Sequence, residues 1–116
     1  MAVKSGIWVD AHLRRARMMG LMAVLVQRGA EEAGAIYLRV ILPGGKARLF
    51  GPPPGAAYDG QGRKRWALPL GADPVAEAET ESYLARQRKY DPDIWVLDIE
   101  DREGNGLIEA DCVEKG

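Results

Sequence analysis

Three carboxylates stand within four residues at positions 98–101, and this segment is the first candidate for chemistry. Asp98, Glu100 and Asp101 end the stretch IWVLDIED, which is otherwise apolar. Converging carboxylates can bind Mg²⁺ or Ca²⁺, and a pair of them can act as general acid and base. In a strand, Asp98 and Glu100 share a face, whereas Asp101 points the other way. One strand therefore supplies two such ligands, and because the sequence identifies no others, we predict no metal site.

Arginines in neighbouring predicted strands offer these carboxylates a simpler role. Arg39 and Arg48 are expected on strand faces that point away from the core, where they can lie opposite Asp98 or Glu100. Charge pairing across strands, or plain solvation, then accounts for the acidic cluster. We therefore expect Asp98 and Glu100 to bind no metal tightly.

His12 is the only histidine of the chain and the second candidate. An imidazole titrates near neutral pH and can serve as a general base. His12 falls within the apolar stripe of a predicted helix, where a lone histidine is more often half-buried with one hydrogen bond. No serine or cysteine can be assigned to it, so we predict no catalytic residue. An enzyme built on His12 with Asp98 or Glu100 is the third interpretation of the sequence.

Basic residues precede an aromatic one in the segment RKRW, residues 63–66. Such mixtures suit contact with phosphates and stacking on bases. A nucleic-acid-binding domain that uses Arg39, Arg48 and this segment is therefore the second interpretation. The chain has 17 acidic and 16 basic residues and a formal net charge of −1, so any basic surface must be local.

The glycine-rich segments and the single cysteine predict no cofactor. PGGKAR, which starts at Pro43, lacks the full phosphate-binding loop pattern, and GAEEAGA, which starts at Gly29, lacks the dinucleotide-binding pattern. Cys112 stands alone, which excludes an internal disulfide and a zinc site made of several cysteines.

Two helices are predicted to position these residues. Residues 5–19 carry apolar side chains in phase with about 100° per residue, and Gly20 supplies a left-handed stop. A strand over residues 3–9 is the competing interpretation, because Ile, Trp and Val follow one another there. The second helix is predicted from Pro74 to about Tyr90, with acidic residues early and basic residues late, which complements the helix dipole.

Strands are expected where apolar residues alternate or form short runs. The expected strands cover residues 21–28, 35–42, 46–50, 65–70 and 94–100. Residues 51–64, rich in proline and glycine, are expected to form a long loop. Residues 102–116 are expected to form a hairpin partner or a flexible tail.

A Gly44-Gly45 turn is expected to join the strands 35–42 and 46–50. A two-residue turn pairs Leu42 with Ala47 and Val40 with Leu49. This register keeps the apolar side chains on one face of the sheet.

Strands that follow one another between isolated helices indicate the α+β class. At 116 residues we predict a single globular domain over residues 1–116. Its sheet is expected to be largely antiparallel, with about five strands and two helices packed on one face. The residues expected in the core are Trp8, Leu38, Val40, Leu49, Tyr83, Trp95, Leu97 and Ile99.

The sheet face that the helices leave free would carry aromatic, aliphatic and guanidinium groups. Such groups often anchor protein interfaces. We predict a non-enzymatic binding domain whose partner is an unknown protein or a second copy of the chain. The alternative is that the loop 51–64 or the C-terminal segment covers this face within the monomer. Ile41 lies on the same expected face, and the candidate binding residues are Tyr37, Arg39, Arg48, Phe50, Arg65 and Trp66.

We expect a cytoplasmic protein. No apolar run approaches the roughly 20 residues that a membrane span needs. The first 15 residues also lack the apolar core of a signal peptide, because Asp10 and arginines follow too soon.

Several stretches of the chain resemble one family of small alphaproteobacterial proteins that is catalogued only as a domain of unknown function. They are KSGIWVDAHLRRARMMG, RGAEEAGAIYLRV, RLFGPPPGA and YLARQRKYDPDIWVLDIEDREG. The resemblance runs from about Lys4 to Gly104, and its most specific part is R-x-x-D-P-D-x-W-V-x-x-I-E-D, from Arg88 to Asp101. It implies a single-domain bacterial protein, and it implies no activity, cofactor or catalytic residue.

Overall fold

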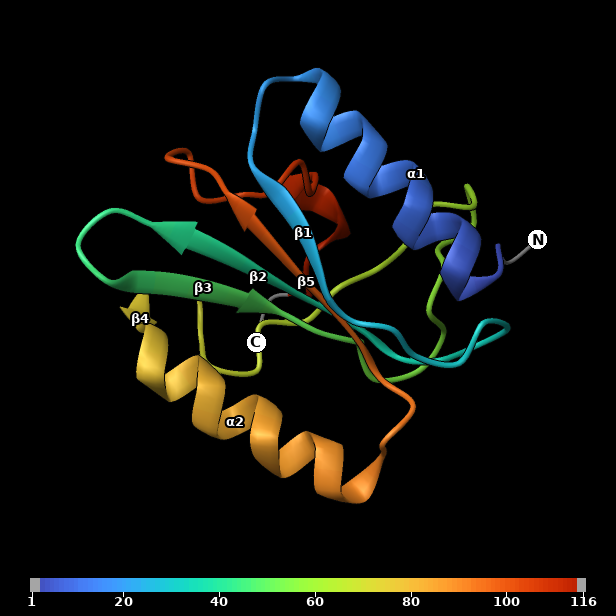
Figure 1. The fold of residues 1–116 in the computed structure, drawn as a ribbon. Helices are drawn as coiled ribbons and strands as arrows, with labels where there is room; N and C mark the ends of the chain where they lie inside the picture. The colour runs from blue at the N-terminus through green and yellow to red at the C-terminus, as the bar shows by residue number, and fades with distance from the viewer. Residues whose placement is uncertain (1–2, 115–116) are drawn as a thin grey trace.

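The structure is a computed structural model that describes residues 3–114. Figure 1 shows α1 above the strands and α2 below them. In chain order the elements are α1 (Ser5–Met18), β1 (Ala23–Gln27), β2 (Ile36–Leu42), β3 (Lys46–Phe50), β4 (Val75–Ala76), α2 (Glu77–Tyr90), β5 (Trp95–Glu100) and a short 3₁₀ helix, η1 (Ala110–Cys112).

The strands form one five-stranded sheet in the order β1-β5-β2-β3-β4. The last strand of the chain, β5, therefore lies inside the sheet, antiparallel to β1 and parallel to β2. The remaining pairings, β2 with β3 and β3 with β4, are antiparallel. This arrangement confirms the predicted α+β class and the largely antiparallel sheet.

The two helices pack on opposite faces of the sheet, so their predicted placement on one face is wrong. Leu38 and Val40 of β2 lie in one apolar cluster with Val9 of α1. Tyr37, on the other face of the same strand, lies in a second cluster with Leu84 of α2. The physical reason is that β2 and β5 are buried on both faces, and two apolar faces require two covers.

The β2–β3 hairpin differs from its predicted register by one residue. Pro43, Gly44 and Gly45 all belong to the turn, and both glycines have positive φ, 79° and 73°. Leu42 consequently pairs with Lys46, and Val40 pairs with Arg48. Because side chains alternate along a strand, a slip of one residue moves every β3 side chain to the opposite face.

Three other segments depart from the predicted elements. Residues 65–70 form no strand and contribute only single bridges, Gly51 with Ala67 and Trp66 with Val113. Residues 75–76 form β4, so α2 begins at Glu77 and not at Pro74. Instead of a hairpin strand, the segment after residue 106 contains η1; residues 115–116 of the predicted tail lie outside the described residues.

The core contains most of the side chains that the sequence predicts. Trp8 and Tyr83 are the exceptions, since both are only partly buried. The predicted core residues that are buried are Leu38, Val40, Leu49, Trp95, Leu97 and Ile99.

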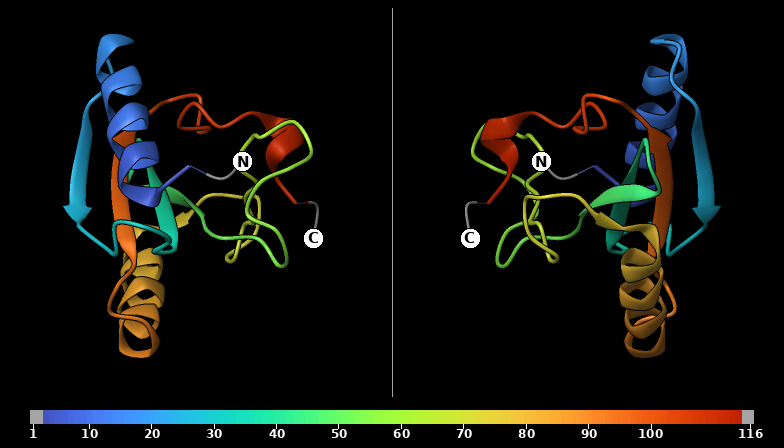
Figure 2. Two further views of the ribbon diagram at one scale, coloured as in Figure 1. Left: turned by 90° about the vertical axis from the view of Figure 1, so that its right-hand side faces the viewer. Right: turned by 90° about the vertical axis from the view of Figure 1, so that its left-hand side faces the viewer.

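The loop before β4 (residues 51–74) and the C-terminal segment (residues 101–114) lie together on one side of the sheet. Figure 2 shows both of them projecting from the same side, away from β1. Trp66 joins them, because its backbone N–H donates to the Cys112 carbonyl at 2.8 Å and its carbonyl accepts from Glu114 N–H at 2.7 Å. Within residues 3–114, no helix combines the length and apolar character that crossing a membrane requires.

We expect Leu97→Ala to lower the free energy of unfolding by about 2–5 kcal/mol, because the substitution leaves a cavity in the core. Leu97 is fully buried on the α1 face. Denaturant melts measure the loss. Ile7→Ala, at a position 56% exposed on α1, is the control and should change stability by less than about 0.5 kcal/mol. A loss below about 1 kcal/mol for Leu97→Ala would contradict its place in the core.

Candidate functional site

The structure does not bring the predicted binding residues onto one face. Tyr37 and Arg39 point toward α2, whereas the shifted register places Arg48 and Phe50 on the α1 face. Phe50 is buried, and its ring lies edge-on to Trp66 at 6.3 Å between centroids. The predicted patch of Tyr37, Arg39, Arg48 and Phe50 therefore does not form, and a binding role for any of these residues stays a prediction.

Arg39 and Asp98 form an ion pair between the sheet and α2. Arg39 Nε and Nη2 donate to the two oxygens of Asp98 at 3.0 and 2.8 Å. Arg39 Nη1 donates to the Thr80 hydroxyl at 3.2 Å and to a Glu81 carboxylate oxygen. The two side chains stand on paired positions of β2 and β5, so the predicted pairing of Asp98 with a strand arginine is confirmed for Arg39. Arg48 lies on the other face, and its predicted pairing is wrong.

The three carboxylates of residues 98–101 thus have separate roles. Both oxygens of Asp98 are occupied by Arg39, and Glu100 is exposed at the strand end. Asp101 is buried and accepts hydrogen bonds from the backbone N–H groups of Glu103 and Gly106 at 3.0 and 2.9 Å. Asp101 therefore holds the turn after β5, while the expectation that Asp98 and Glu100 bind no metal tightly stays a prediction.

We expect Asp98→Ala to destabilise the protein by about 3 kcal/mol, because it leaves the Arg39 guanidinium buried without its main partner. The Arg39 side chain is 9% exposed and that of Asp98 is 21% exposed. Chemical denaturation gives the change in unfolding free energy. Glu100→Ala, on the same strand and face but exposed, should lie within about 0.5 kcal/mol of wild type.

A double-mutant cycle with Arg39→Met separates the ion pair from the strand itself. In the Arg39→Met background no buried cation remains, so the loss caused by Asp98→Ala should become much smaller. An equal loss in both backgrounds would show that the pair is not the source of the effect.

His12 is buried on α1 and makes one hydrogen bond, to the Gly106 carbonyl at 2.8 Å from Nε2. Its ring stacks on Trp8, with centroids 4.5 Å apart. Burial lowers the pKa of His12 below 6.5; the bond to Gly106 opposes this shift, and the charge of Arg15 adds to it. Because His12 packs on the α1 face and Asp98 points toward α2, the structure does not bring His12 together with that carboxylate.

His12 should make the protein less stable in mild acid. The unfolded imidazole titrates near 6.5 and the folded one at lower pH. The unfolded chain therefore binds more protons as the pH falls below about 6.5, and the stability that His12 contributes above that pH is lost. We expect His12→Gln, which keeps an N–H donor, to reduce the fall in unfolding free energy between about pH 7.5 and 5.5. An unchanged fall would assign the pH dependence to other groups.

The basic segment 63–66 is largely neutralised within the chain. Arg63 pairs with Asp59, Glu109 and Asp111, at 3.0, 3.1 and 2.9 Å. Arg65 pairs with Glu114. These contacts fasten the loop to the C-terminal segment, and they occupy the guanidinium groups that the nucleic-acid interpretation requires.

One group of potential metal ligands lies close together among residues 3–114. The ligand atoms of Glu109, Asp111 and Cys112 lie within 4.8 Å of one another. Arg63 already forms an ion pair with each of the two carboxylates. Cys112 is buried, and burial raises the pKa of its thiol. The arrangement is an ion-pair network beside a protonated thiol.

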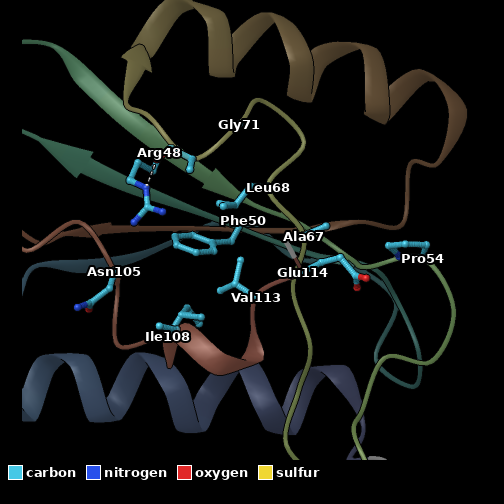
Figure 3. A pocket seen from close by; sticks show the side chains of 12 residues that line it. Arg48, Phe50, Pro54, Ala67, Leu68, Gly71, Asn105, Ile108, Val113 and Glu114 are labelled. Atoms are coloured by element: carbon cyan, nitrogen blue, oxygen red, sulfur yellow. Dashed lines mark hydrogen bonds between the residues drawn. The ribbon is translucent and has the colours of Figure 1, made fainter. Parts of the chain in front are cut away.

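A large cavity lies between β3, the end of the loop and the C-terminal segment (Figure 3). Its volume is about 820 Å³. Apolar side chains form most of the wall, and Figure 3 shows Arg48 on one side of it with Glu114 and Pro54 on the other. The lining residues with apolar side chains include Phe50, Ala67, Leu68, Ile108, Ala110 and Val113.

Arg48 is held at the edge of this large cavity by backbone contacts. Its Nε donates to the Ala72 carbonyl at 2.9 Å and its Nη1 to the Gly104 carbonyl at 2.6 Å. Its guanidinium carbon lies 5.1 Å from the centre of the Phe50 ring. No carboxylate of residues 3–114 forms an ion pair with Arg48. Arg48 is therefore a positioned cation that can pair with an acidic group of a ligand.

Sequence reasoning found Arg48 and Phe50 but missed the cavity that they line. Leu68, Ile108 and Val113 belong to segments that were expected to form strands. Their apolar character was visible in the sequence, but the meeting of residues 67–72 with residues 105–114 depends on tertiary contacts through Trp66. No local pattern marks that meeting.

Comparison with known proteins agrees with the resemblance found in the sequence. The model of the family described as "Protein of unknown function (DUF1491)" matches residues 3–109. The crystal structure of a DUF1491 family protein from Caulobacter crescentus is similar over 99% of this chain and 100% of its own, with 33% identity and a TM-score of 0.79. No curated protein matches the chain.

Two structures in solution are similar as well. The NMR structure of a DUF1491 family protein from Caulobacter crescentus has 36% identity and a TM-score of 0.76, and 99% of each chain is covered. The solution structure of protein Atu0922 from A. tumefaciens has 35% identity and a TM-score of 0.72, and 87% of each chain is covered.

Proposed function

Because the chain belongs to the DUF1491 family, whose function is unknown, we propose its function from the geometry of the large cavity. We infer that the protein is a non-enzymatic binding domain, and that the cavity takes an apolar segment of a partner protein. The observation that carries this proposal is an apolar wall that ends at a guanidinium group without a carboxylate partner among the described residues.

The size and lining of the cavity support binding. Protein interiors are normally packed without large voids. Covering an open apolar cavity with another apolar surface removes both surfaces from water, which lowers the free energy. A volume of about 820 Å³ falls in the range of ligand-binding pockets, roughly 300–1,000 Å³. It has room for several side chains of a peptide segment.

The charges at the cavity edge favour a peptide of one kind. Arg48 on one side attracts an acidic residue, and Glu114 on the other side attracts a basic one, although Glu114 already pairs with Arg65. A segment with an apolar middle and an acidic residue next to it therefore complements the site. Arg48 is held by two carbonyls before any ligand arrives, so little side-chain entropy is lost on binding.

A protein partner fits these groups better than a nucleic acid. The guanidinium groups of Arg39, Arg63 and Arg65 are already paired with carboxylates. Arg48 alone cannot track a phosphate backbone. The compartment we propose is the cytoplasm, where the free thiol of Cys112 would remain reduced.

Peptide display against the folded protein tests the proposal. Selected peptides should share a large apolar residue close to an aspartate or glutamate. Ala110→Phe places a ring into the cavity from an exposed position and should weaken their binding at least about tenfold. Ala78→Phe, at an exposed position of α2 on the opposite face, is the matched control and should bind as wild type does.

Substitution of Arg48 tests the charged part of the proposed site. Arg48→Met keeps an apolar stem over Phe50 but removes the cation, so binding of the acidic peptides should weaken about tenfold and lose its dependence on salt. Arg86→Met, exposed on α2, should have no effect. Selected peptides that bind equally to the Ala110→Phe and Arg48→Met variants would refute the proposed site. Failure to select any peptide, while small apolar acids bind, would assign the cavity to a small molecule.

A further inference from the structure

Lys64 lies in surroundings that no other described lysine shares. Its Nζ is 4.7 Å from the centre of the Trp66 ring and 5.7 Å from the centre of the Tyr58 ring. Lys4, Lys46 and Lys89 are exposed. Lys64 is half-buried beside the two rings, and among residues 3–114 no carboxylate pairs with its amine and no side-chain hydrogen bond to it forms. The amine is thus positioned but unpaired.

Lys64 lines two further cavities, apart from the large cavity. One has a volume of about 150 Å³ and is also lined by Arg15, His12 and Trp66. The other has a volume of about 540 Å³ and is also lined by Tyr58 and Pro53. Lys64 lines both, so a small molecule bound in either one would contact its side chain.

We propose that Lys64 is a nucleophilic amine at which the chain is acylated by a small acyl phosphate. In this reaction the Lys64 nitrogen attacks the carbonyl carbon of the donor and a C–N bond forms. The C–O bond to phosphate breaks, phosphate leaves with the electron pair, and the amine proton passes to solvent. The product is a neutral amide, and no oxidant or reductant is needed.

The chemistry of the surroundings supports this assignment. Only the neutral amine is a nucleophile, and an apolar enclosure disfavours the ammonium form. Burial lowers the pKa of Lys64 to about 8, so a sizeable fraction of this amine is neutral near pH 7.5, whereas a solvated lysine with a pKa of about 10.4 is almost fully protonated. Arg15 is exposed beside the smaller cavity and can attract the leaving phosphate.

The other lysines of the chain serve as internal controls for the test. The wild-type protein is incubated with acetyl phosphate, and the acetylation rate of each lysine is followed by peptide mass spectrometry from about pH 6.5 to 10. Near pH 7.5 Lys64 should react about tenfold faster than Lys46 or Lys89, since its larger neutral fraction outweighs its lower intrinsic nucleophilicity. Its rate should level off above about pH 8, whereas the rates of the exposed lysines continue to rise.

Three further measurements separate the parts of the proposal. Tyr58→Ser admits water to the amine, so Lys64 should no longer react faster than the exposed lysines. The free energy of unfolding of this variant is measured to check that it is folded. Arg15→Gln should slow acetylation by acetyl phosphate several-fold but leave acetylation by the uncharged N-acetoxysuccinimide unchanged; Arg14→Gln, exposed on the same helix, is the control. In a parallel reaction acetyl-coenzyme A replaces acetyl phosphate. With this bulkier thioester, the ratio of the acetylation rate of Lys64 to the rates of the other lysines should be smaller.

If Lys64 in the wild-type protein reacts no faster than Lys46 and Lys89, or if its rate keeps rising to pH 10 as theirs do, Lys64 is only a structural contact of Trp66. Selective acetylation by acetyl-coenzyme A alone would overturn the choice of an acyl phosphate as donor. Both results come from the unmodified chain, so they hold even where the Tyr58→Ser variant fails to fold.

Discussion

The parallel pairing of β2 with β5 is the constraint on which the rest of the structure depends. The two strands lie inside the sheet, and both faces of each are buried along most of their length. Apolar side chains on both faces demand a cover on both sides, which α1 and α2 supply. The same pairing sets the buried cation Arg39 beside its anion Asp98, and burial of the pair costs less than burial of either group alone.

Several features could be predicted from the sequence because they depend on local rules. The second helix and its end near Tyr90 follow from its charge order, although its start at Glu77 does not, and β2 and β5 follow from their apolar patterns. Strand alternation put Arg39 and Asp98 on the same side of the sheet, but their contact depends on the pairing of β2 with β5, which alternation does not predict. The turn at Gly44-Gly45 was also predicted correctly. The register, however, depends on whether Pro43 belongs to the turn. The preference for glycine pairs in turns does not distinguish a loop of two residues from one of three.

The rest required tertiary information. The error of one residue in the register placed Phe50 on the wrong face. As a result, a side chain of the core was predicted to belong to a binding surface. The large cavity depends on backbone hydrogen bonds between Trp66 and residues 112 and 114, which lie more than forty positions away along the chain. Residues 67–72 and residues 105–114 form no helix or strand of appreciable length, so the sequence shows no periodic pattern in either segment.

The position of β5 has a consequence for how the chain acquires its structure. β1 and β2 are consecutive in the chain, yet they do not pair, because β5 lies between them. A nascent chain can close the β2–β3 hairpin early, but β1 has no strand beside it until residues 95–100 have been synthesised. Folding must therefore wait for a contact of high sequence separation, which slows it. During synthesis on the ribosome, the incomplete sheet would expose the edge of β2 to neighbouring chains, and the arrival of the last strand closes it.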